Sequence, residues 1–140
     1  MNWRLISQLS LFGLAMGIAT VFVVQSNVEP IYWLVIFLIS SYLIATRAPS
    51  RYFLHGVFVG LANSVWVTGS HLFLFHQYVA NHPREVAMMA SMPLKTHPRL
   101  MMLIMGPIIG LISGMVLGLF AIVARKLVSP RAAPTERPAH

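Results

Sequence analysis

The chain has 140 residues, of which 57% are hydrophobic and only 9% are charged, and its mean hydropathy is +0.74. This composition is far too apolar for a soluble domain of average usage and indicates an integral membrane protein. The absence of cysteine excludes structural disulfides, thiolate metal sites and dithiol redox chemistry. The formal net charge is +7, but the basic residues are scattered between apolar segments, which is typical of topology signals and lipid contacts rather than of a nucleic-acid-binding face.

Two apolar segments in the first half of the chain predict the first two transmembrane helices, over residues 5–24 and 31–46. On the first helix, Gly13 and Gly17 fall on one face with Ser10 and Thr20, which should be buried. A cleavable signal peptide is the alternative interpretation of this segment, but the apolar run continues past the poor cleavage sequence at residues 15–17.

The second half predicts two more spans, over residues 52–78 and 100–124. The third span is the most polar, and His55 and His76 are expected at its two membrane interfaces. Between the spans lies a loop in which residues 83–92 should form a short interfacial helix begun by one proline and ended by the next. Residues 129–140 are proline-rich and lack an apolar face, so a disordered cytoplasmic tail is expected there.

Glycines recur at intervals of four residues in these spans. In the fourth span, each glycine is rotated by about 40° from the previous one, so they form a continuous groove of small residues. Apolar helices gain little hydrophobic energy by leaving lipid, and close backbone approach therefore drives their association. Leu117 is expected on a different face of the fourth span from the glycines. The prediction is an all-α integral membrane four-helix bundle, with residues 1–128 as one domain, packed through a GxxxG-type glycine zipper: Gly13, Gly17, Gly56, Gly60, Gly106, Gly110, Gly114 and Gly118. The same ladder would also suit a thin wall beside a pore.

A possible internal duplication underlies this pattern. Residues 13–20 resemble residues 56–63 at a fixed offset, and the two segments would cross the membrane in the same direction. The chance alignment of glycine-containing apolar segments is the alternative explanation.

The basic residues predict the orientation in the membrane. With four spans, one side carries seven of them, Arg4, Arg47, Arg51, Arg125, Lys126, Arg131 and Arg137, and the other carries three, Arg84, Lys95 and Arg99. Because cytoplasmic loops are enriched in Lys and Arg, both termini are expected in the cytoplasm of a bacterial inner membrane.

Three polar residues within the spans form a candidate polar site: Asn63, His71 and Ser113. Polar groups at membrane depth are costly and often functional, although hydrogen bonds between helices are the simpler explanation. Pro107 leaves the carbonyl of Leu103 without its helical partner and should kink the fourth span there. The sequence predicts that His71 donates a hydrogen bond to this carbonyl.

A candidate metal site lies on the outer side of the membrane. Six of the nine methionines fall within residues 88–105, close to three histidines. Thioethers and imidazoles are suitable ligands for Cu(I), although methionine is also an ordinary residue of an apolar helix face. The candidate ligands are His76, His82, Met88, Met89, Met92 and His97.

The sequence carries no motif for catalysis or for a cofactor. The three acids, Glu29, Glu85 and Glu136, all lie outside the expected spans, which disfavours a proton-coupled exporter that uses an embedded carboxylate. A non-enzymatic packing or assembly component is the leading hypothesis. The alternatives are a small oligomeric channel or transporter and a periplasm-facing copper-binding protein. The expected partners are membrane lipids and either further copies of the chain or another membrane protein, and nucleic acid is not expected.

Overall fold

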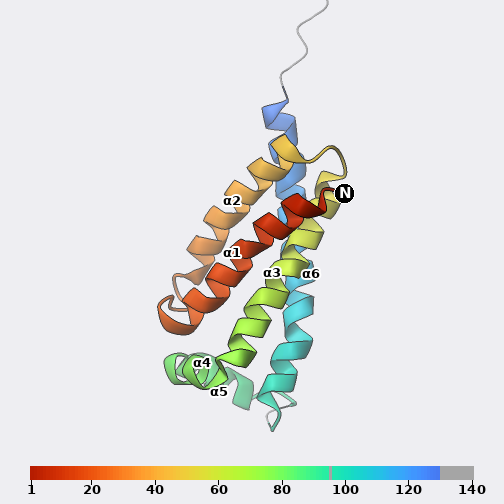
Figure 1. Cartoon of the computed structure of the whole chain (residues 1–140). Helices are drawn as coiled ribbons and strands as arrows, with labels where there is room; N and C mark the ends of the chain where they lie inside the picture. Colours follow the sequence, from red (N-terminus) through yellow and green to blue (C-terminus); the bar gives the residue numbers. More distant parts are fainter. Residues whose placement is uncertain (95, 130–140) are drawn as a thin grey trace, which may run out of the picture.

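The computed structural model describes residues 1–94 and 96–129, and within these ranges the chain forms six α-helices and no strand (Figure 1). The helices are α1 (Trp3–Phe22), α2 (Glu29–Arg47), α3 (Tyr52–Phe73), α4 (Phe75–Asn81), α5 (Pro83–Ala90) and α6 (Pro98–Val128). The all-α prediction is confirmed for this part of the chain. The expected disordered tail falls, apart from Ser129, outside the described residues.

Three helices, α1, α2 and α6, are long and apolar enough to cross a membrane, which is consistent with a membrane protein. A fourth span is present only if α3 and α4 are taken together, and these two helices are bent by 88° relative to each other. The expected single helix over residues 52–78 therefore ends at Phe73. After the break the segment becomes polar, and it runs across the end of the bundle, where Asn81 donates a hydrogen bond of 2.7 Å to the carbonyl of Val21.

Helix α3 is the centre of the bundle and packs mainly against α6 on one side and α1 on the other. The backbones of α3 and α6 are in direct contact. A methyl group added at Gly60 would collide with Gly114, and one added at Gly56 would collide with Gly118. On the other side, a methyl group at Gly13 would lie 2.5 Å from the Cα atom of Asn63. The eight glycines predicted for packing all lie against residues of this same chain. Besides the residues just named, they contact Phe53, Val57, Ser64, Val67, Thr68 and Ser70.

Helix α2 is attached differently, because it packs chiefly against α6. Near the C-terminal end of α2, Arg125 of α6 donates a 3.3 Å hydrogen bond to the carbonyl of Ala45, and in the middle of α2 Phe37 meets Phe120 edge to face. The expectation that Leu117 faces away from the core is wrong. Its side chain is fully buried, because α6 has α3 on one side and α2 on the other, so that its buried arc is wider than the glycine ladder.

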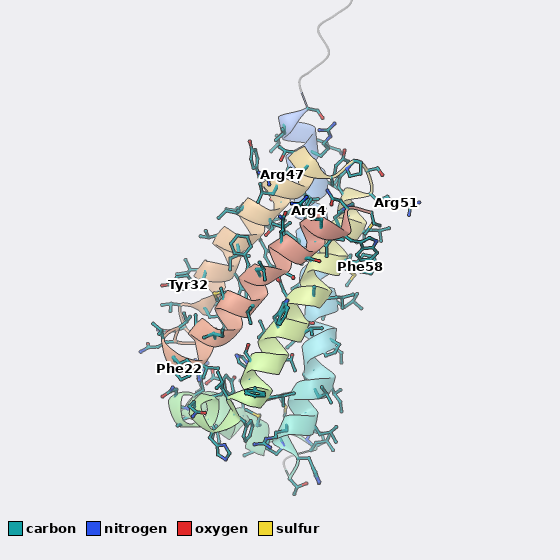
Figure 2. All side chains as sticks on the ribbon, viewed as in Figure 1. Arg4, Phe22, Tyr32, Arg47, Arg51 and Phe58 are labelled. Atoms are coloured by element: carbon teal, nitrogen blue, oxygen red, sulfur yellow. The ribbon has the colours of Figure 1, made fainter. Side chains whose placement is uncertain are left out.

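The N-terminal end of the bundle gathers basic side chains. Arg4, Arg47 and Arg51 lie at the same end of the molecule (Figure 2). His55, one turn after Arg51, is fully buried, and its Nε2 accepts a 3.0 Å hydrogen bond from the backbone N–H of Asn2. The amide at the start of α1 has no partner within the helix, so this contact supplies one. The proton then lies on Nδ1, which donates to the carbonyl of Arg51 at 3.0 Å.

Candidate functional site: a methionine-lined cavity

A cavity of about 470 Å³ lies between α2, α3 and α6, and α4 and α5 border it at the end of the bundle where they lie. Helix α2 diverges from α6 toward this end (Figure 1). We call this space the methionine cavity. Its lining residues in the described part of the chain are Glu29, Trp33, Phe37, Gly60, Asn63, Ser64, Val67, Thr68, His71, Tyr78, Glu85, Met88, Met89, Met92, Met101, Met102, Met105, Gly106, Ile109, Gly110 and Ser113.

Six methionines make up much of the apolar lining. Met88 and Met89 belong to α5 and Met92 follows it, whereas Met101, Met102 and Met105 lie in the first turns of α6. The loop between these helices brings the two groups to the same cavity. Methionine side chains are unbranched and polarizable, so a surface made of them adapts to ligands of different shapes.

One side of the cavity is polar and belongs to α3. Gly60, Asn63, Ser64, Thr68 and His71 follow one another along this helix, so the lining extends from its middle to near its end. Ser64 uses its hydroxyl to donate to the carbonyl of Leu61 at 2.8 Å.

Among these polar residues of α3, Asn63 has a side-chain N–H group without a hydrogen-bond partner in the described residues. Its side chain is only 4% exposed, and its Oδ1 accepts a 3.1 Å hydrogen bond from the backbone N–H of Gly13. Among the described residues its Nδ2 has no hydrogen-bond partner. An unpaired buried donor costs free energy, on the order of 1–3 kcal/mol, unless another molecule accepts from it. Because the Nδ2 atom is itself buried, it is shielded from the cavity, and the Asn63 side chain holds α1 against α3 through its bond with Gly13.

Aromatic and acidic side chains line the end of the cavity formed by α2, α4 and α5. Glu29 in the first turn of α2 accepts a 3.0 Å hydrogen bond from Trp33 Nε1, one turn later. Trp33 and Phe37 meet edge to face, with ring centroids 6.2 Å apart. Across the cavity, the ring of Tyr78 stacks on His71 at 4.3 Å and on His82 at 4.5 Å. This end thus combines aromatic rings with a carboxylate.

Glu85, in the first turn of α5, is the second acid that lines the cavity. Partial burial alone would raise the pKa of its carboxyl group. A hydrogen bond with Ser26, a backbone hydrogen bond of Glu85 itself and the charges of His82 and Arg84 act in the opposite direction and together lower the pKa below its ordinary value. Glu85 is therefore a carboxylate at neutral pH.

The structure brings the three residues of the predicted polar site, Asn63, His71 and Ser113, to the same cavity. The predicted hydrogen bond from His71 to Leu103 is wrong, because His71 Nε2 lies 2.8 Å from Thr20 Oγ1 of α1. Helix α3 presents Gly56 and Gly60 to α6, whereas Asn63, Ser70 and His71 meet α1. Helix α6 continues through Pro107 as one helix.

Three of the six predicted metal ligands line the cavity. Met88, Met89 and Met92 line the cavity, whereas none of the three histidines does. His82 is buried with its Nδ1 3.0 Å from the carbonyl of Tyr78, and His97 Nδ1 lies 2.8 Å from Thr96 Oγ1. His76 packs edge to face on Phe75. In the described residues, no three His, Cys, Asp or Glu side chains lie close enough together to hold a metal ion.

Several cavity residues were not predicted from the sequence. Glu29 and Glu85 lie outside the apolar segments and were counted only as evidence against an embedded carboxylate. A signal was present in the spacing of Glu29 and Trp33, because residues four positions apart on a helix are neighbours and Trp N–H requires an acceptor when it is buried. Glu85 had no comparable signal, since its position depends on the bend after α3.

Comparison of the chain with protein-family models, with curated proteins and with solved structures gave no match.

Proposed function

We propose that the protein is a small multi-pass membrane carrier that binds a compact organic molecule in the methionine cavity. The observation that carries the proposal is the cavity itself, with its methionine lining and the polar residues of α3. Its volume of about 470 Å³ falls within the range of about 300–1,000 Å³ typical of small-molecule sites. A mostly apolar wall with a few polar groups is also the usual composition of such sites.

The glycine contacts favour this function over the leading hypothesis, a packing or assembly component. That hypothesis needs small-residue faces that are open to a partner. The eight predicted packing glycines are already covered by residues of the same chain, and only Gly69 has open space where a side chain would be. The small residues therefore supply the internal packing that keeps α1, α3 and α6 together beside the cavity.

Transport is supported by the extent of the cavity along α3. Its polar residues reach from the middle of a candidate span to the end of the bundle, and polar groups at membrane depth commonly mark substrate paths. The expected bacterial inner membrane, with both termini in the cytoplasm, is part of this proposal. In that orientation the methionine end of the cavity faces the periplasm.

A binding experiment tests the proposal. Trp33 lines the cavity, so in a Trp3→Phe/Trp66→Phe background its fluorescence reports ligand entry in detergent. The probes are tetraphenylphosphonium, tetraphenylborate and the neutral triphenylphosphine oxide. Ser113→Phe places a ring in the cavity and should weaken binding at least about tenfold, because the ring occupies the ligand's space.

Ile112→Phe is the matched control, because Ile112 is the neighbouring residue, is 54% exposed and does not line the cavity. This variant should bind as the parent does. The proposal is wrong if no probe quenches Trp33 saturably, or if both substitutions have the same effect. Uptake of a bound probe into proteoliposomes, blocked by Ser113→Phe alone, then separates a carrier from a static binding protein.

A further inference from the structure

The acidic residues of this basic chain are concentrated at the methionine cavity. The whole sequence has ten Lys and Arg but only three Asp and Glu, and two of these three acids, Glu29 and Glu85, line the cavity. Within residues 1–94 and 96–129, no Lys or Arg lines it. The charged residues in the described part of the lining are thus both acidic, whereas the chain as a whole is basic, and this charge favours cations.

Both carboxylates are held in place by neighbouring groups. Glu29 accepts from Trp33 Nε1 at 3.0 Å, which places a carboxylate next to an indole ring that also lines the cavity. Glu85 bonds with Ser26 of the loop between α1 and α2. The two acids come from different helices, α2 and α5, and both line the cavity.

The remaining lining suits an organic cation rather than an inorganic one. Aromatic faces attract cations, and Trp33, Phe37 and Tyr78 supply three rings. Methionine sulfurs are polarizable and adapt to bulky apolar groups. A bare Cu(I) ion needs a few sulfurs in direct coordination, whereas a space of about 470 Å³ accommodates a molecule of drug size.

We infer that the ligand of the methionine cavity is a lipophilic monovalent organic cation, with its charge near Glu29 and Glu85 and its apolar groups among the methionines. This inference depends on the cavity being the binding site proposed above. The ligand's positive charge distinguishes it from a lipid acyl chain, which the apolar walls alone would also accept.

The experiment compares ions of the same shape and opposite charge. Tetraphenylphosphonium and tetraphenylborate are titrated against the Trp33 reporter in a nonionic detergent, with triphenylphosphine oxide as the neutral reference. The parent should prefer the cation. The double substitution Glu29→Gln/Glu85→Gln removes both charges but keeps an acceptor for Trp33, and it should weaken binding of the cation about tenfold while leaving the neutral compound unchanged. Glu136→Gln is the control for a general loss of negative charge.

The outcomes separate this inference from the proposed function. If Ser113→Phe blocks all three probes but the anion binds as well as the cation and the double Gln variant is unaffected, the cavity is a binding site and its cation selectivity is refuted. If silver(I), a soft-metal probe, quenches Trp33 saturably and the organic cation does not compete, the site takes a metal and the inference is overturned. If no probe binds, the proposed function itself fails.

Discussion

Alanine substitutions at two glycines of α3 provide a sharp test of the packing. At Gly60, a methyl group would collide with the backbone of Gly114, and the carbonyl oxygen of Gly110 would be 2.7 Å away. At Gly69, on the same helix, no atom lies within 4 Å of the added methyl group. Replacing glycine by alanine within a helix is favourable by about 0.5–1 kcal/mol, and this contribution is the same at both positions. It therefore cancels when the two variants are compared.

The difference between Gly60→Ala and Gly69→Ala is then the cost of forcing α3 and α6 apart, about 1–3 kcal/mol for overpacking against backbone atoms that cannot rotate away. We expect Gly69→Ala to unfold at a slightly higher denaturant concentration than the parent and Gly60→Ala to unfold at a lower one. Reversible unfolding in mixed micelles, followed by circular dichroism, measures both. Equal midpoints for the two variants would show that α3 and α6 do not pack through these glycines.

Three further predictions concern orientation, a hydrogen bond and acid stability. A reporter that is active only in the cytoplasm should work after His140, and one that is active only outside should work within residues 86–96; an externally active C-terminal fusion would contradict the orientation. In a double-mutant cycle, Thr20→Val and His71→Leu should show a coupling free energy of about 0.6 and at most about 1.7 kcal/mol, whereas additive effects would mean that their 2.8 Å contact contributes nothing. Because the fold lowers the pKa of Glu85 below its ordinary value of 4.5, the ionised group stabilises the fold above that value and this contribution is lost as the pH falls through the lowered pKa. Melting temperatures measured from about pH 7 to pH 3 should therefore fall less steeply in Glu85→Gln, and parallel curves would refute the assignment.

Much of the helical structure could be predicted from the sequence, because apolar length and glycine spacing are local properties. The glycines of the fourth apolar segment indicated a face for close approach, and in the structure Gly110, Gly114 and Gly118 meet Ser64, Val57 and Phe53 of α3. The third helix ends earlier than the sequence predicts, because contacts with a distant segment determine the path of the chain after Phe73. Together with α3, the segment after Phe73 passes as a candidate span, but in the structure it turns across the end of the bundle, where Asn81 bonds the carbonyl of Val21.

The methionine cavity could be predicted only in part. Asn63, His71 and Ser113 were identified because polar residues are unusual within apolar segments, and the methionines because they cluster along the chain. What the sequence lacks is the divergence of α2 from α6 and the bend at Leu74, both of which depend on contacts between distant segments. These two features bring Glu29 and Glu85 to the same space from separate parts of the chain.

The one-sided attachment of α2 has a mechanical consequence. The contacts of Arg125 with Ala45 and of Phe120 with Phe37 hold this helix from its middle to its C-terminal end, whereas its first turn, with Glu29, borders the cavity. The segment from Glu29 to Phe37 is about 12 Å long at a rise of about 1.5 Å per residue, so a tilt of about 10° around Phe37 moves the first turn by about 2 Å. A small rotation of this segment can thus change the width of the cavity, while the glycine contacts among α1, α3 and α6 stay intact.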